Sequence, residues 1–363
     1  MIAVRPAFSR KAVTRAGHIL SGQIVVAESQ EYFDALDVLS NWRACHSYPI
    51  NTFQATLRAK IKTITTAQTL VAQRLKRTPS IIYKLQRNPG MELARMQDIG
   101  GLRAVMPSVA MVRKLHQSYK ANERRFQHTF GTFKDYISNP KDDGYRGLHQ
   151  VFKYKNPTVP FYDGLQIELQ IRTKLQHSWA TAVETMSTFL NQGLKVGAGD
   201  EKYREYLRVC SAAFCILEKC PGVPGYENSS LRDIVEIIRG MEQELSVISK
   251  LQGFSVAAQN IDVSGNANAA YNLVILNIPD RKVRVRPFSS TQLDEATEAY
   301  TEAEKRVQDG ERLEVVLVSA GPIKSLKKAY PNYFLDTANF VQEVQKLIGQ
   351  PHFGNPATVT RGG

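Results

Sequence analysis

Cysteine is scarce in this sequence of 363 residues, which contains only four. They are Cys45, Cys210, Cys215 and Cys220, and the last three are spaced five residues apart without a CxxC pair or a nearby histidine. Structural zinc sites normally combine closely spaced pairs of such ligands, so this spacing argues against a zinc knuckle. Free thiols in a reducing cytosol are the expected state.

Long apolar runs are also lacking. No window approaches the roughly 18 apolar residues of a membrane-spanning helix, and residues 1–17 spread their charges without the apolar stretch of a secretory signal. With 43% hydrophobic and 22% charged residues, the chain is predicted to be a folded, soluble, cytoplasmic protein without a membrane partner.

Acidic residues are under-represented in the first two thirds of the chain. Residues 1–240 contain 34 lysines and arginines against 20 acids, whereas residues 241–363 contain 13 against 14. A basic segment attracts phosphate-bearing partners such as nucleotides or RNA. An ordinary globular domain with a basic surface would have the same composition.

The order of helical and extended patterns predicts an α+β protein. Apolar residues recur at helical spacing through residues 9–75, and residues 78–190 alternate predicted helices and strands. We therefore expect a mixed β-sheet flanked by helices. The loose stretch at 260–272 predicts a boundary between a domain at 1–259 and a small C-terminal αβ domain at 260–363.

The first of four polar motifs is RLKRTPSIIYKLQR, at 74–87. A helix capped by Thr78 and running to about residue 97 would place Ser80, Lys84 and Arg87 on one face. Together with the free N–H groups of the helix start, they would form a cradle for several phosphates. No Walker loop or GxGxxG motif occurs in the sequence. A solvated basic helix would show the same pattern.

Two further motifs each supply one carboxylate. In MQDIGGLR, at 96–103, Asp98 stands beside two glycines that would let a ligand approach a strand edge. In IELQIRTKLQHSWATAVE, at 167–184, Glu168 and Gln170 alternate with apolar residues, as expected of a strand. Two carboxylates beside substrate phosphates are typical ligands of Mg²⁺. A helix end and a solvent-facing strand are the simpler interpretations.

The remaining motif is KDDGYRGLH, at 141–149, preceded by KDYI. On a single strand Tyr145 and His149 would share one face, and Gly147 would leave room between them for a stacked base. An ordinary strand with a core tyrosine and a hydrogen-bonded histidine fits the same pattern.

Taken in order, the four motifs resemble the synthetase domain of the RelA/SpoT family of alarmone synthetases. The resemblance covers roughly residues 9–250 and is carried by RLKRTPSIIYKLQR, DIGGLR, KDYI with GYRGLH, and IELQIRTKLQHSWA. It implies a pyrophosphotransferase fold and a Mg²⁺-dependent enzyme that transfers the β,γ-pyrophosphate of ATP to a ribose 3′-hydroxyl.

The resemblance also implies roles for individual residues. Asp98 would be the principal Mg²⁺ ligand, and Glu168 would help to hold the metal and polarise or deprotonate the acceptor hydroxyl. The implied ATP-binding residues are Arg74, Lys76, Ser80, Lys84 and Arg103. The implied acceptor-binding residues are Lys134, Lys141, Tyr145 and His149. Gln170, Arg172 and His177 would support the site.

Two features depart from the family pattern. Family members often have Asn before Gly-Tyr, whereas this chain has Asp142-Asp143. A carboxylate there disfavours an acceptor with many phosphates. The HD-type hydrolase pair of long family members is not found in the N-terminal helical region, so removal of pyrophosphate is not expected.

The C-terminal part contains the stretch YPNY, with Tyr330 and Tyr333. It resembles the YxxY motif of the fused toxin–antitoxin synthetases of phage defence, often called CapRel. The resemblance implies that these tyrosines block the nucleotide site until a phage protein binds the C-terminal domain. Two packing tyrosines would produce the same letters.

Many members of that class modify the 3′ end of tRNA, so the tRNA acceptor end is the expected acceptor. Candidate RNA contacts are Arg10, Lys11, Arg15, Arg124 and Arg125. One alternative is an alarmone synthetase acting on free GDP, GTP or adenine nucleotides. Another is a non-catalytic nucleotide-binding sensor, against which the presence of both Asp98 and Glu168 argues.

Overall fold

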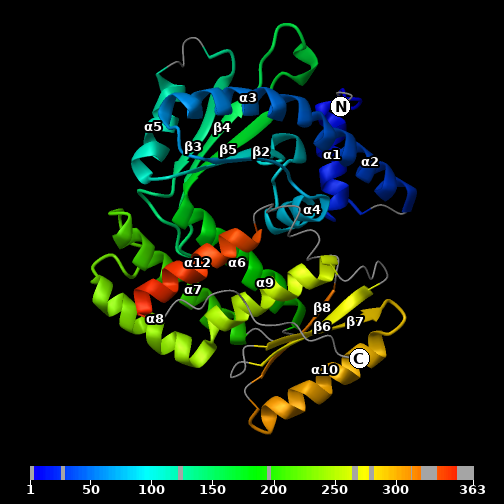
Figure 1. Ribbon diagram of the computed structural model, residues 1–363. Coiled ribbons are helices and arrows are strands. Elements are labelled where there is room, and N and C mark those ends of the chain that lie inside the picture. Colours follow the sequence, from blue (N-terminus) through cyan, green and yellow to red (C-terminus); the bar gives the residue numbers. More distant parts are fainter. Residues whose placement is uncertain are drawn as a thin grey trace. The chain divides into compact units, whose positions relative to one another are not determined.

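The computed structural model describes residues 4–25, 29–121, 126–193, 198–263, 269–277, 282–311, 313–319 and 333–349. The chain has the expected α+β architecture, with helices and two separate β-sheets (Figure 1). It divides into two compact units. The first unit consists of residues 1–138 and 146–174, and the second of residues 139–145 and 175–363.

The first unit is built on a mixed five-stranded sheet with the order β1-β2-β5-β4-β3. Strands β2 and β5 are parallel, and the other neighbours are antiparallel. The strands are β1 (Leu70–Leu75), β2 (Gly100–Met106), β3 (Thr129–Asp135), β4 (Leu148–Lys153) and β5 (Gln166–Thr173). The helices are α1 (Arg10–Leu20), α2 (Ser29–Cys45), α3 (Ser47–Ile64), α4 (Thr78–Arg87) and α5 (Val109–Lys120), with short turns η1 (Leu93–Arg95) and η3 (Pro160–Tyr162).

Alternation along the strands separates an apolar from a polar face of this sheet. Helices α3 and α5 cover the apolar face (Figure 1). Leu102, Leu169 and Phe152 point toward these helices and are almost fully buried. Because side chains alternate, the residues between them project from the opposite face, where polar groups gather.

Helix α4 is shorter than the sequence pattern predicts. Its N-cap is Arg77, not Thr78, and it ends at Arg87 instead of continuing to about residue 97. Asn88 is the C-cap, Pro89 follows, and Gly90 has a φ of +88°, so the backbone leaves the helical region there. The expectation of a long helix was therefore wrong.

The second unit combines helices with a small antiparallel sheet of order β7-β6-β8. Its strands are β6 (Ala269–Asn277), β7 (Lys282–Ser289) and β8 (Leu313–Ser319). Its helices are α6 (Lys174–Gly193), α7 (Ala198–Leu217), α8 (Leu231–Leu245), α9 (Val247–Val263), α10 (Leu293–Gln308) and α12 (Tyr333–Ile348).

The C-terminal helix α12 packs against α8 and α9 and shares their core (Figure 1). Phe340 is fully buried, and its ring meets that of Phe214 from α7 edge to face at 5.9 Å. Helix α12 therefore belongs to the same packed core as α7, α8 and α9. The two compact units therefore do not coincide with the domains predicted at 1–259 and 260–363. The predicted division into a synthetase domain and a regulatory domain stays a prediction.

In the part of the chain that the structure describes, no helix is both long enough and apolar enough to cross a lipid bilayer.

Candidate active site

Strand pairing brings residues from three motifs onto the polar face of the five-stranded sheet. Arg74 in β1 pairs with Gly101 in β2, and Gly101 pairs with Glu168 in β5. Arg103 pairs with Gln170 one step along the same strands. Directly paired residues project to the same side of a sheet. The motifs are therefore neighbours in space although they are far apart in sequence.

These residues line an open cleft with about 350 Å³ of empty space, part of which is open to solvent. Its lining residues are Arg74, Lys76, Asp98, Gly101, Leu102, Arg103, Glu168 and Gln170. The cleft contains three cationic and two anionic side chains, so it suits a ligand with several charges.

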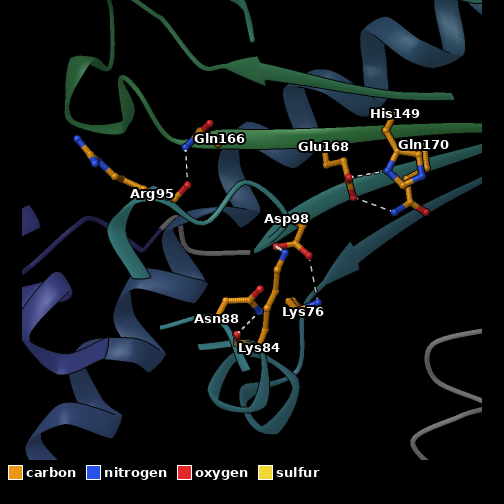
Figure 2. A network of polar contacts seen from close by, with 9 residues as sticks. All are labelled: Lys76, Lys84, Asn88, Arg95, Asp98, His149, Gln166, Glu168 and Gln170. Carbon is orange, nitrogen blue, oxygen red and sulfur yellow. Dashed lines mark hydrogen bonds and ion pairs between the residues drawn. The ribbon is translucent and has the colours of Figure 1, made fainter. Parts of the chain in front are cut away.

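Asp98 precedes β2 and lies between two lysines (Figure 2). Lys76 Nζ is 3.1 Å from Asp98 Oδ2, and Lys84 Nζ is 2.9 Å from Oδ1. Burial raises the pKa of Asp98, but the two ammonium groups outweigh it and hold that pKa below its ordinary value. Asp98 is thus an ionised carboxylate that two cations neutralise.

Glu168 accepts hydrogen bonds on both of its oxygens (Figure 2). His149 Nδ1 lies 2.8 Å from Oε1, and Gln170 Nε2 donates to Oε2 at 2.8 Å. Arg172 in turn donates to Gln170 Oε1 at 2.7 Å and so fixes the orientation of that amide. Burial raises the pKa of Glu168, but the His149 contact and the other donors outweigh it and lower that pKa to about 2.

The donor set of the cleft fits a magnesium ion only in combination with a substrate. Among the described residues, no group of three or more His, Cys, Asp and Glu side chains is arranged to hold a metal. Asp98 and Glu168 are hard oxygen ligands that line one cleft. Mg²⁺ is usually held by one or two carboxylates together with substrate phosphates and water. The residues therefore fit Mg²⁺ bound with a polyphosphate.

The two glycines of the DIGG motif serve different purposes. A Cβ on Gly100 would lie 3.0 Å from His46 Cβ and Ile167 Cδ1, so this glycine allows close packing inside the protein. Gly101 lines the cleft, and a Cβ there would lie 3.3 Å from the backbone oxygen of Glu168. The expectation that both glycines open the strand to a ligand was wrong for Gly100.

Tyr145 does not lie on a strand with His149, contrary to expectation. Strand β4 begins only at Leu148, and Gly144 and Gly147 have φ values of +87° and +155°. These positive φ values interrupt the alternation that would place both rings on one face. Tyr145 instead belongs to residues 139–145, which pack with the second unit.

The other residues predicted to bind the acceptor lie in different units. Lys134 is exposed on β3 and pairs with His149, so it projects from the polar face of the first sheet. Lys141 belongs to the second unit, and its Nζ lies 5.0 Å from the ring centre of Tyr145. His177 is buried on α6 in that unit.

Several predicted residues lie away from the cleft lining. Ser80 is on α4, one turn before Lys84, but is not among the lining residues. Arg10 donates to the backbone oxygen of Asp163 at 3.1 Å, and Arg15 lies 3.6 Å from Glu31. Lys11 is exposed on α1. Arg124, Arg125 and Tyr330 lie outside the described residues, as does the side chain of Tyr333 at the start of α12.

Arg43 was missed by the motif reading. It lies on α2, and its Nε donates to the backbone oxygen of Lys76 at 2.7 Å. Lys76 N also donates to Ile99 O at 2.8 Å, so α2 and the strand edge together fix the turn that presents Lys76. A single arginine in a helix gave no sequence signal of this contact.

Comparison with known proteins places the cleft within a recognised region. The family described as "Region found in RelA / SpoT proteins" matches residues 73–192. The chain is 34% identical over 119 residues to the GTP pyrophosphokinase YjbM of Bacillus subtilis, covering 32% of this chain and 55% of that protein. It is 27% identical over 147 residues to a GTP pyrophosphokinase of Escherichia coli K12, covering 40% and 18%. The chain thus spans about half the length of one relative and under a fifth of the other.

Solved structures give matches of the same kind. The small alarmone synthetase 1 of Bacillus subtilis bound to its product pppGpp has 26% identity and a TM-score of 0.42, covering 48% of this chain and 89% of that one. Small alarmone synthetase 2 of the same organism has 19% identity and a TM-score of 0.41, covering 50% and 94%. Residues 73–192, which match the region found in RelA and SpoT proteins, include every lining residue of the cleft.

Proposed function

We propose that the protein is a pyrophosphokinase that transfers the β,γ-pyrophosphate of ATP to a ribose 3′-hydroxyl. The observation that carries the proposal is the pair Asp98 and Glu168, two ionised carboxylates in one cleft with Arg74, Lys76 and Arg103. The similarity of the chain to GTP pyrophosphokinases, and of residues 73–192 to the region found in RelA and SpoT proteins, supports the same reaction.

In this reaction the acceptor 3′-oxygen attacks the β-phosphorus of ATP. The bond from that phosphorus to the oxygen bridging it to the α-phosphorus breaks, AMP leaves, and the hydroxyl proton is released. Arg74, Lys76, Lys84 and Arg103 would bind the triphosphate, because cations close to phosphoryl oxygens stabilise the charge that develops there. Asp98 and Glu168 would hold Mg²⁺, which when bound polarises the phosphoryl groups.

Glu168 would orient and polarise the acceptor hydroxyl. With a pKa of about 2 and both oxygens already accepting hydrogen bonds, it is a weak base in the ligand-free site. The fixed carboxylate of Glu168 would nevertheless accept a hydrogen bond from the ribose hydroxyl and hold it in line for attack. Such positioning is a large part of phosphoryl-transfer catalysis. His149 and Gln170 would keep the carboxylate in place.

For the acceptor we propose the 3′ end of tRNA first. The excess of basic residues in the first 240 residues supports it, because lysines and arginines bind the phosphates of a nucleic acid. The carboxylates of Asp142 and Asp143 disfavour the alternative, a free nucleotide with many phosphates. The second candidate is a guanine nucleotide, GDP or GTP, which the names of the relatives favour.

We further propose that the protein is a self-inhibited toxin of the fused toxin–antitoxin type in phage defence, acting in the cytoplasm. Tyr330 and Tyr333 would block the nucleotide site until a phage protein binds the C-terminal part. The YPNY stretch supports this proposal.

The acceptor is tested by incubating the full-length protein with γ-labelled ATP and, separately, total tRNA, GDP, GTP or an adenine nucleotide. The Tyr330→Ala, Tyr333→Ala double variant is assayed in parallel, because a self-inhibited parent would give little product. Label on tRNA alone supports the first acceptor, and label on GDP or GTP alone supports the second. Absence of label from every acceptor in both proteins refutes pyrophosphate transfer.

A further inference from the structure

The predicted acceptor residues Lys141 and Tyr145 lie on a tightly folded loop in the second unit, residues 139–145. Gly144 N donates to Lys141 O at 2.9 Å, and Lys141 N donates to Tyr145 O at 3.1 Å. Asp143 Oδ1 accepts from Tyr145 N at 2.9 Å. These bonds set the shape of the loop but do not fix its place in the unit.

Helix α7 fixes the loop through Ser211. This serine is 1% exposed, and its Oγ donates to the backbone oxygen of Gly144 at 2.6 Å. Gly144 itself lies against the helices: a Cβ there would be 3.1 Å from Ser211 Cβ and 3.2 Å from Arg208 Cα. With a φ of +87° as well, only glycine fits this position comfortably.

The ring of Tyr145 is placed by the same anchor. A Cβ on Gly144 would also be 3.2 Å from Trp179 Cζ2, and the Tyr145 and Trp179 ring centres are 6.4 Å apart. Trp179 Nε1 donates to Leu207 O at 2.7 Å, which ties α6 to α7 beneath the loop. The Tyr145 ring thus lies near Trp179 of α6, and the ammonium group of Lys141 lies over the ring.

We propose that Ser211 is a positioning residue for the acceptor: its hydroxyl anchors the loop so that Tyr145 and Lys141 meet the acceptor in one fixed arrangement. The inference rests on the proposed function, because it gives Tyr145 and Lys141 their ligand. Ser211 lies outside the region matched at 73–192 and was not among the residues singled out from the sequence.

The variant Ser211→Ala removes the hydroxyl and leaves the Gly144 oxygen without this donor. Because one buried hydrogen bond is lost, we expect the KM for the acceptor to rise roughly fivefold, with kcat and the KM for ATP unchanged. The matched control is Ser178→Ala, since Ser178 is equally buried but donates within its own helix, to Leu175 O at 3.0 Å. A second variant, Gly144→Ala, should raise the acceptor KM further.

Kinetics are measured with whichever of GDP, GTP or total tRNA the protein labels, in the parent or the double tyrosine background. Hydrogen exchange is followed by mass spectrometry in the same variants without any substrate. We expect Ser211→Ala to speed exchange in residues 141–145, while the rest of α7 and the melting temperature stay near the parental values.

Each outcome decides the matter. A raised acceptor KM together with faster loop exchange supports the proposal. Unchanged exchange, or an equal loss of ATP and acceptor affinity with a lowered melting temperature, overturns it, because Ser211 then does not anchor the loop or acts only in general packing. If neither background transfers pyrophosphate, the proposed function fails, and the exchange experiment still decides whether Ser211 fixes the loop.

Discussion

Lys84 Nζ lies 2.9 Å from Asp98 Oδ1, so a lysine of the proposed ATP cradle occupies one oxygen of the proposed metal ligand. Lys76 occupies the other oxygen at 3.1 Å. A divalent cation therefore competes with two ammonium groups for Asp98. Triphosphate oxygens would draw the lysines away, and we expect metal and nucleotide to bind together.

The first prediction concerns metal binding without nucleotide. In Lys84→Gln, Asp98 Oδ1 loses its cation, so the affinity of the nucleotide-free protein for Mn²⁺ should rise severalfold while the affinity for ATP falls. Titration calorimetry with Mn²⁺ alone and with ATP alone measures both. Lys120→Gln is the control. Lys120, on α5, lies over the ring of Phe133 and is not among the residues that line the cleft. Equal Mn²⁺ affinities for parent and Lys84→Gln would contradict the competition.

The second prediction is that Asp98→Asn abolishes pyrophosphate transfer. The amide keeps the shape but removes the charge that would hold the metal. Asp135→Asn is the matched control: Asp135 also pairs with a cation, Arg113, and also has a lowered pKa, yet it lies outside the cleft lining. The measurement is the rate of AMP formation with saturating acceptor. Activity retained in Asp98→Asn would reject its assignment.

The third prediction is that Glu168→Gln lowers kcat by roughly 100-fold or more, as expected when a charged group that acts in the transition state is removed. Because the carboxylate also accepts hydrogen bonds from His149 and Gln170, the melting temperature is measured in parallel to separate lost catalysis from lost folding. An active Glu168→Gln variant would remove this residue from the proposed mechanism.

The fourth prediction concerns pH and stability in the second unit. Burial raises the pKa of Glu242 from 4.5 to about 7, although its Oε1 accepts from Ile248 N at 3.0 Å. The folded state then holds a proton that the unfolded state has lost, so the free energy of unfolding should fall by about 3 kcal/mol between pH 4.5 and pH 7.

Urea unfolding at a series of pH values tests this dependence. Glu242→Gln removes the titrating group and should flatten the fall, whereas Glu244→Gln, at an exposed residue paired with Lys202, should retain it. The same pH profile for the parent and Glu242→Gln would show that another group is responsible.

The fifth prediction is that the double variant Tyr330→Ala, Tyr333→Ala is toxic when expressed, because self-inhibition would be lost. A truncation at residue 259 is a poorer test, since it removes Phe340 and the rest of α12 from the core of the second unit. Growth of the double variant at the parental rate would show that these tyrosines do not inhibit.

Local pattern predicted the parts of the site that depend on strand alternation. Glu168 and Gln170 project from the polar face, as a two-residue period requires. The four motifs could be ordered along the chain, but the register that pairs Arg74 with Gly101 and Gly101 with Glu168 depends on long-range pairing that the sequence does not display.

Glycines and single polar contacts account for what the sequence reading did not reveal. Positive φ values at Gly144 and Gly147 take Tyr145 off the strand, and a left-handed Ser246 separates α8 from α9. The contacts of Arg43 and Ser211 with backbone oxygens come from helices without a recognisable motif. Such contacts are set by packing and have no period in the sequence.

The most direct test of the central claim is the identity of the nucleotide left after reaction. The full-length protein, or the double tyrosine variant if the parent is inhibited, is incubated with ATP and the acceptor, and the products are separated and weighed by mass spectrometry. Pyrophosphate transfer predicts AMP in equal amount to an acceptor heavier by one pyrophosphoryl group. Formation of ADP, or of AMP with no change in acceptor mass, would contradict it.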